Sequence, residues 1–196
     1  MARVLIVEGS ERGLSLARAL IEEGHAVRIV ASVPQRREEV EAVGAECFCG
    51  TPTRLATLRG ALEHVTIACW LLADIGRQDP ELARALHGSR LRQFLSSAID
   101  STLRGFVYEA AAGPIPAEVL AQGEQIVSET AARNSIPVAI LTAAMEDRKA
   151  WLAQARAAVS SLLAGGDSPV AARYAGTDTP KSRSTFGTEV STQEDS

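Results

Sequence analysis

Short runs of consecutive apolar residues alternate along the chain with longer segments in which apolar residues recur every three or four positions. The first run, RVLIV, leads to a glycine-containing loop, and leucine, alanine and isoleucine then recur at helical spacing from Leu14 to Ile21. Gly24 stands where a glycine commonly ends a helix, and the next apolar run begins two residues later. The pattern therefore predicts a strand, a loop, a helix and a second strand over residues 3–32.

The same alternation repeats as far as residue 165 and predicts about six strands and six helices. The expected strands span residues 3–7, 26–32, 45–50, 65–73, 104–111 and 136–142. The expected helices span residues 14–24, 35–44, 53–63, 79–99, 116–134 and 147–165. Apolar strands separated by helical crossovers form a parallel sheet covered on both faces. The sequence thus predicts an α/β fold, a doubly wound, Rossmann-like parallel sheet that forms a single domain over residues 1–164.

The segment 165–196 has a different composition, rich in Gly, Ser, Thr and Asp and without an apolar period. Such a segment buries too little surface to offset the entropy of ordering it. We therefore expect a disordered tail. The alternative is that Val170, Tyr174 and Phe186 dock on a partner or on a second subunit.

Charge and hydropathy narrow the range of partners. The net charge of −4 comes from 20 basic and 24 acidic residues without a basic block, so a general nucleic-acid binder is not expected. The chain has neither a secretory leader pattern nor an apolar run of membrane-spanning length. We expect a cytoplasmic protein that does not enter a membrane.

Cysteine and histidine do not form a recognisable metal-binding pattern. Cys47 and Cys49 would share one face of a strand, and Cys69 makes the number of cysteines odd. Buried, reduced thiols are the expected state, with a metal or redox role for the pair as the alternative. The three histidines are scattered, so no metal site is predicted.

The loop after the first strand has the features of a phosphate-binding turn, in which glycines let a phosphate approach the unpaired N–H groups at a helix start. Its sequence, EGSERGLS, resembles the Thr-Gly-x-x-x-Gly-x-Gly loop of the short-chain dehydrogenase/reductase superfamily. Gly9 and Gly13 match the first two glycines, whereas Glu8 replaces the threonine and Ser15 replaces the last glycine. The resemblance implies a nucleotide cofactor held by the loop and the first helical turn. The candidate ligands there are Gly9, Ser10, Glu11, Arg12, Gly13 and Leu14.

The second strand ends without the acidic residue that holds the ribose hydroxyls of NAD. Ser32 and Arg36 follow it, and Arg12 stands where members of this superfamily often carry a basic residue that favours NADP. NADP is therefore the expected cofactor and NAD the less favoured one. The alternative is that Arg36 and its neighbours are only the solvated start of a helix. Glu8 opposes binding, because a carboxylate about 6 Å from a phosphate charge costs on the order of 3 kcal/mol at an effective dielectric of about 20.

The resemblance also implies a proton relay made of a serine after the fifth strand and a tyrosine followed four residues later by a lysine. Here the serine region reads Ala110, Ala111 and Ala112, and Tyr108 is followed four residues later by alanine. The two lysines, at 149 and 181, have no such spacing to a tyrosine. The relay is absent and the catalytic residues are unknown.

Three carboxylates stand near the expected carboxyl ends of strands, where an open α/β sheet forms its crevice. Asp74, Glu109 and Glu146 could each act as a base if burial raised the pKa, or could simply cap and solvate an element. Trp70 is expected in the core, with the lining of a nucleotide pocket as the alternative.

Two functions follow from these observations. The first is an NADP-linked oxidoreductase related to the short-chain dehydrogenases/reductases, which lacks their usual relay. The second is a non-catalytic nucleotide-sensing or scaffold protein. The segment 79–99 is a usual place for subunit contacts in such folds, so a homo-oligomer is one expected assembly.

Overall fold

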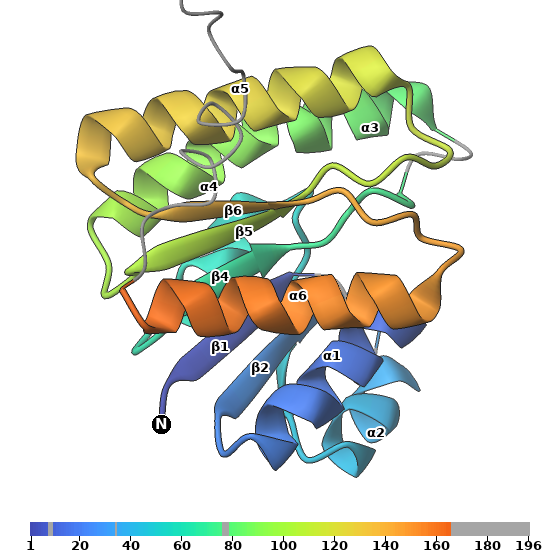
Figure 1. Cartoon of the computed structure of the whole chain (residues 1–196), viewed down its shortest axis with the longest axis vertical. Helices are drawn as coiled ribbons and strands as arrows, with labels where there is room; N and C mark the ends of the chain where they lie inside the picture. The colour runs from blue at the N-terminus through green and yellow to red at the C-terminus, as the bar shows by residue number, and fades with distance from the viewer. Residues whose placement is uncertain (8–9, 34, 76–78, 166–196) are drawn as a thin grey trace, which may run out of the picture.

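The computed structural model describes residues 1–7, 10–33, 35–75 and 79–165. They form a six-stranded parallel sheet with the strand order β3-β2-β1-β4-β5-β6 (Figure 1). The strands are β1 (Arg3–Val7), β2 (Ala26–Ala31), β3 (Glu46–Cys49), β4 (Ile67–Trp70), β5 (Gly105–Glu109) and β6 (Val138–Leu141). The order reverses between β1 and β4, and at such a point the crossovers diverge and open a crevice at the carboxyl edge of the sheet. The predicted doubly wound α/β fold is confirmed.

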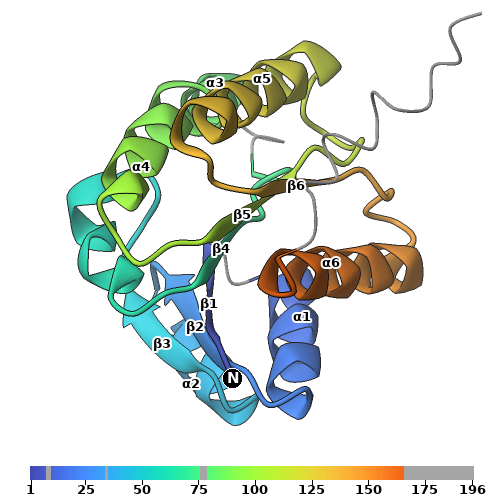
Figure 2. The same cartoon turned by 60° about the vertical axis from the view of Figure 1, so that its left-hand side comes forward.

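Helices cover both faces of the sheet. They are α1 (Glu11–Glu22), α2 (Gln35–Ala42), α3 (Pro80–His87), α4 (Ser89–Ile99), α5 (Ala117–Asn134) and α6 (Arg148–Leu163). Figure 2 shows α3, α4 and α5 on one side of the sheet and α1 and α6 on the other. Leu5 and Val7 of β1 belong to the apolar cluster beneath α4, whereas Val4 and Ile6 belong to the cluster beneath α1 and α6. Burial of both faces explains why β1 is apolar at consecutive positions.

The segment expected to form a helix over residues 53–63 instead forms two short 3-10 helices, η1 (Leu55–Leu58) and η2 (Gly60–Leu62). Gly60 weakens a regular helix there. The buried guanidinium of Arg28, on β2, donates from Nη1 to the carbonyls of Gly60, Ala61 and Glu63 at 3.2, 2.8 and 3.2 Å. These tertiary hydrogen bonds hold the segment in its irregular path against the sheet.

The helix expected over residues 79–99 is divided in two at Gly88. This glycine has φ −119° and ψ −102°, which is not helical. A side chain could not stand there without movement, since a Cβ would lie 2.6 Å from the carbonyl oxygen of Arg84. The break separates α3 from α4 and turns the imidazole of His87 into the core, where it is fully buried.

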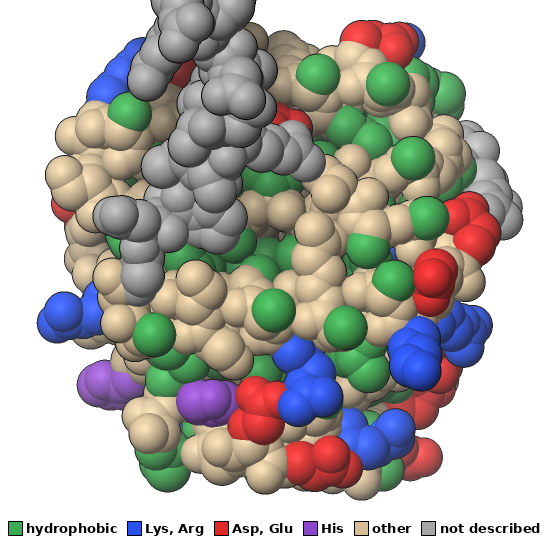
Figure 3. Space-filling model, in the orientation of Figure 1, with side chains coloured by type: hydrophobic (Ala, Val, Ile, Leu, Met, Phe, Trp, Pro, Cys, Tyr) green, Lys and Arg blue, Asp and Glu red, His purple; other side chains and the backbone are tan. Residues whose placement is uncertain are grey.

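Among the described residues, no helix is both long and apolar enough to cross a membrane. On the face shown in Figure 3, basic and acidic side chains are interspersed and do not form one basic patch. The expected tail lies outside the described residues, apart from its first residue, Gly165.

Candidate functional site

Ser10 and the first turn of α1 follow the carboxyl end of β1, at the edge of the sheet where a crevice is expected. Glu8, which is expected to oppose phosphate binding, and Gly9, which is expected to favour it, lie outside the described residues. Ser10 is the N-cap of α1, and its hydroxyl accepts the N–H of Gly13 at 3.4 Å. One of the N–H groups expected to face a phosphate is therefore already engaged within the helix start.

The first turn of α1 also contains a carboxylate, which would compete with a bound phosphate for the positive end of the helix dipole. Glu11 is exposed in this turn, where its charge stabilises the positive end of the helix dipole. Leu14 is buried in the core, and the hydroxyl of Ser15 donates to the carbonyl of Glu11 at 2.8 Å. The serine that replaces the third glycine is thus accommodated in the helix by a local hydrogen bond.

A pocket of about 260 Å³ lies at the carboxyl ends of β2 and β3. It is lined by Val30, Ala31, Ser32, Val33, Arg36, Gly50, Thr51, Pro52, Thr53, Ile75, Leu82 and Leu86. The structure therefore brings the predicted ligands Ser32 and Arg36 to one pocket, between apolar walls from the α3 side and polar backbone from the loop after β3. Gly50 keeps this loop close to η1, because a Cβ there would lie 3.1 Å from the Thr57 carbonyl oxygen.

Arg36 is the cation of this pocket. It is paired with Glu39 one turn along α2, and its side chain is 32% exposed. The neighbouring Arg37 faces away, toward Glu41 and the thiol of Cys49. Since an exposed ion pair within a helix contributes only a few tenths of a kcal/mol, Arg36 can leave Glu39 for a phosphate at little cost.

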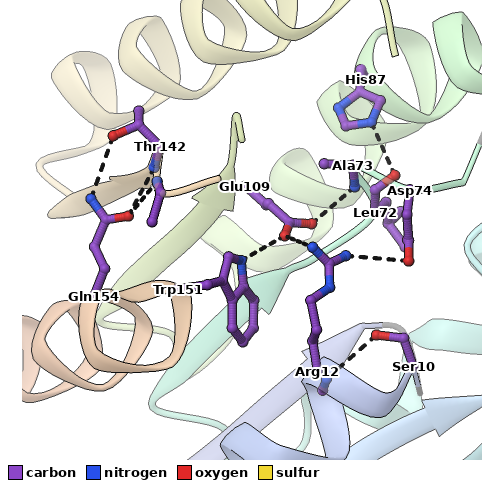
Figure 4. A network of polar contacts seen from close by, with 12 residues as sticks. Ser10, Arg12, Leu72, Ala73, Asp74, His87, Glu109, Thr142, Trp151 and Gln154 are labelled. Atoms are coloured by element: carbon purple, nitrogen blue, oxygen red, sulfur yellow. Dashed lines mark hydrogen bonds and ion pairs between the residues drawn. The ribbon is translucent and has the colours of Figure 1, made fainter. Parts of the chain in front are cut away.

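Arg12 lies on the other side of the switch point. Its guanidinium reaches Glu109, the last residue of β5, at 3.0 Å and Asp74, beyond the end of β4, at 3.2 Å (Figure 4). We call these three residues the Arg12 bridge. The structure therefore places Arg12 with two of the predicted crevice carboxylates and not with Ser32 and Arg36. The contact of Arg12 with a ribose 2′-phosphate stays a prediction.

Glu109 is the most enclosed acid of the site, with no exposed surface. Its carboxylate accepts the backbone N–H of Ala73 at 3.0 Å and the indole N–H of Trp151, on α6, at 2.8 Å. Burial raises the pKa of Glu109, while Arg12 and these two hydrogen bonds act in the opposite direction. The acid is held by two hydrogen-bond donors and one cation, an arrangement that fixes it in place.

Tyr108 is separated from the crevice. It points to the α3–α5 side, where its hydroxyl lies 2.6 Å from Nδ1 of His87 and 3.3 Å from the carbonyl oxygen of Leu120. Burial raises the pKa of Tyr108 and lowers that of His87 to about 4. Tyr108 and His87 are therefore both neutral, and they form a buried hydrogen bond within the core.

The other candidates have structural positions. Trp70 is fully buried and packs on Phe94 with ring centroids 4.9 Å apart, as the core interpretation expected. Cys69 is buried, as expected, but the expected burial of Cys47 and Cys49 is wrong: on the edge strand β3, Cys47 is half-buried and Cys49 is exposed, and none of the three forms a disulfide. Glu146 is exposed, and no group of three or more possible metal ligands is found among the described residues. Gln154 attaches the loop after β6 to α6. Its side-chain oxygen accepts hydrogen bonds from two backbone N–H groups of the loop, those of Thr142 and Ala143.

No local motif predicts the Arg12 bridge, because the loop motif places Arg12 at a phosphate and the position of Glu109 at a strand end predicts an isolated acid. A usable signal was nevertheless present, because the first turn of α1 and the ends of β4 and β5 meet at one edge of a doubly wound sheet. An arginine and two acids at these three places are positioned to pair.

Solved structures with a similar fold include vestitone reductase from alfalfa (Medicago sativa), with 15% identity and a TM-score of 0.60 over 72% of this chain and 56% of that chain. A short-chain dehydrogenase/reductase superfamily protein from Agrobacterium tumefaciens, with bound NAD, matches with 18% identity and a TM-score of 0.60 over 71% of this chain and 48% of that one. UDP-glucose 4-epimerase from Thermotoga maritima, with UDP-glucose, matches with 14% identity and a TM-score of 0.61 over 71% and 54%.

These likenesses establish the Rossmann-like fold found in short-chain dehydrogenases/reductases. No protein-family model matches the sequence, and no curated protein is significantly similar to it. The chain matches about half the length of each of these three structures.

Proposed function

We propose that this protein is a relative of the short-chain dehydrogenases/reductases that binds a nicotinamide dinucleotide at the carboxyl edge of its sheet. The observation that carries the proposal is the pocket at the ends of β2 and β3, where Ser32 and Arg36 meet beside apolar walls. It lies on one side of the switch point, the place where doubly wound sheets bind nucleotides. The structural neighbour from Agrobacterium carries NAD in the same fold.

NADP is the cofactor that this pocket suits better. None of the described residues that line it is acidic, so no carboxylate is present to hold the two ribose hydroxyls of NAD or to repel a 2′-phosphate. Arg36 supplies a partly exposed guanidinium, and Ser32 supplies a hydroxyl. A guanidinium recognises a phosphate through charge-assisted hydrogen bonds, which are stronger than neutral ones.

Two functions are compatible with such a site. An NADP-linked oxidoreductase would need unusual catalytic groups, because the serine region consists of alanines and Tyr108 is buried away from the crevice. A nucleotide-sensing or scaffold protein would need only the pocket. The Arg12 bridge favours the second, since it pairs two of the three candidate carboxylates, Glu109 and Asp74, with a cation.

Calorimetric titration with NADP and NAD tests the proposal. Arg36→Ala should weaken NADP binding about tenfold to a hundredfold and leave NAD binding unchanged, because it removes a charged hydrogen-bond donor worth about 1.5–3 kcal/mol. Arg37→Ala is the matched control, since it removes the adjacent arginine, which does not line the pocket. Tighter binding of NAD than of NADP by the unmodified protein would contradict the assignment of Arg36.

A further inference from the structure

The Arg12 bridge crosses the switch point of the sheet. It runs from the first turn of α1, which follows β1, to the ends of β4 and β5, and β1 and β4 flank the switch point (Figure 4). A dinucleotide that extends from the β2–β3 side toward β5 must cross this place. We infer that the Arg12 bridge excludes the nicotinamide half of a dinucleotide, so that the site holds the adenosine 2′-phosphate half alone.

This inference rests on the proposed function, because it assumes that the pocket at the ends of β2 and β3 takes the adenosine half. The pocket and the bridge are direct neighbours along the chain. Ile75 lines the pocket, and Asp74 pairs with Arg12. The bridge thus begins one residue before the pocket lining, on the chain segment that leads from β4 into the pocket.

The size of the pocket agrees with a short ligand. Its volume of about 260 Å³ is below the range of about 300–1,000 Å³ that is usual for sites enclosing a whole drug-sized ligand. The apolar walls formed by Leu82 and Leu86 suit a planar base, and Arg36 and Ser32 suit a phosphate at its ribose. These features recognise one nucleoside and its phosphate.

The bridge is enclosed on several sides. The side chain of Arg12 is 10% exposed and that of Glu109 is fully buried. The guanidinium carbon lies 5.2 Å from the centre of the Trp151 ring, and the same indole donates its N–H to Glu109. An uncharged nicotinamide ribose that displaced Arg12 would leave a buried carboxylate without its cation, which is strongly unfavourable.

The Arg12 bridge can be weakened by substitution, because one of its acids is partly exposed and its guanidinium is held without good hydrogen bonds to the described residues. Asp74 is 37% exposed, so one end of the bridge is in contact with solvent. The two guanidinium nitrogens that reach the acids are buried, and neither makes a hydrogen bond of good geometry with a described residue. Charge and burial therefore hold Arg12 in place, and both can be altered by substitution.

Calorimetry with adenosine 2′,5′-bisphosphate and NADPH tests the inference, because only NADPH carries the nicotinamide half. In the unmodified protein the two affinities should agree within about threefold, since the added half makes no net contribution. In Arg12→Ala/Glu109→Gln, which removes both buried charges together, NADPH affinity should rise at least about tenfold while that for the bisphosphate stays the same. The matched control is Arg156→Ala/Glu23→Gln, which removes an exposed ion pair between α6 and the end of α1.

Saturation-transfer NMR on NADPH gives a second readout that does not depend on the stability of the double variant. The unmodified protein should transfer saturation to the adenine protons and not to the nicotinamide protons. Asp74→Asn, which changes a partly exposed residue, should introduce a nicotinamide signal.

The calorimetric results distinguish failure of this inference from failure of the proposed function. NADPH binding at least about tenfold tighter than the bisphosphate in the unmodified protein would overturn the role of the bridge and leave the proposed function intact. Loss of both ligands in the double variant would identify Arg12 as a phosphate ligand and would also overturn it. Binding of neither ligand to the unmodified protein would remove the proposed function together with this inference.

Discussion

Replacing Arg12 by leucine should destabilise the protein in a way that depends on pH. The substitution leaves Glu109 fully buried with its two hydrogen-bond donors, the Ala73 N–H and the Trp151 indole, and without a cation. Breaking a buried ion pair by removing one partner typically costs about 3–5 kcal/mol. For a domain of this size, with a shift of about 2–4 °C per kcal/mol, Tm should fall by roughly 6–20 °C at pH 8.

The sign of the pH dependence follows from the direction in which the pKa of Glu109 is shifted in the folded state. Burial already raises the pKa of Glu109, and loss of Arg12 removes the charge that opposes this rise. Between the unfolded pKa and the raised folded pKa the folded state binds more protons, so stability falls as pH rises through that window. The penalty of Arg12→Leu should therefore be smaller at pH 5 than at pH 8, because a protonated Glu109 needs no cation.

Thermal unfolding followed by circular dichroism at both pH values measures this. Arg156→Leu serves as the comparison, since its partner Glu23 is solvated and an exposed pair contributes about 0–1 kcal/mol. A Tm loss no larger than that of Arg156→Leu would refute the reasoning. So would a large loss that is the same at pH 5 and pH 8, because it would come from packing and not from an unpaired charge.

Two further predictions concern other parts of the molecule. Burial lowers the pKa of His87 to about 4, so the folded state binds fewer protons than the unfolded state between about pH 6.5 and 4, and acidification should cost up to about 3 kcal/mol. Urea unfolding at pH 7 and pH 5 should show that His87→Gln reduces this loss, and an equal loss in both proteins would exclude His87 as its source. Cutting the chain after Gly166 should change Tm by less than a few degrees, because the removed segment lacks a periodic apolar face; a larger drop in a thermal melt would mean that the tail packs on the domain.

The sequence was sufficient for the sheet because most strands are apolar at consecutive positions and most crossovers contain a helix of regular period. The irregular parts depended on contacts that no local pattern encodes. The path of residues 53–63 is determined by a guanidinium on β2 that binds three carbonyls more than thirty residues away. The break at Gly88 depends on the non-helical torsion angles of this glycine. The apolar residues on both sides keep a helical period, so the sequence pattern does not indicate the break.

The same distinction applies to the site. Ser32 and Arg36 could be placed together from the sequence because both follow the same strand, and both line one pocket. Their contact with a cofactor stays a prediction. Arg12 was assigned to a phosphate from its place in a loop motif. Its actual partners come from the segment after β4 and from β5, about 60 and about 100 residues further along the chain, so only the topology of the sheet connects them.

Gly88 has a consequence for how ligand preference can evolve in this fold. It lies at the junction from which α3 runs back to the pocket with Leu82 and Leu86, yet it lines no part of that pocket itself. Because any Cβ at this position would collide with the Arg84 carbonyl, a substitution must tilt or unwind α3. The width of the pocket at the ends of β2 and β3 therefore depends on a backbone angle, and a mutation outside the pocket lining can change the size of ligand that the pocket admits.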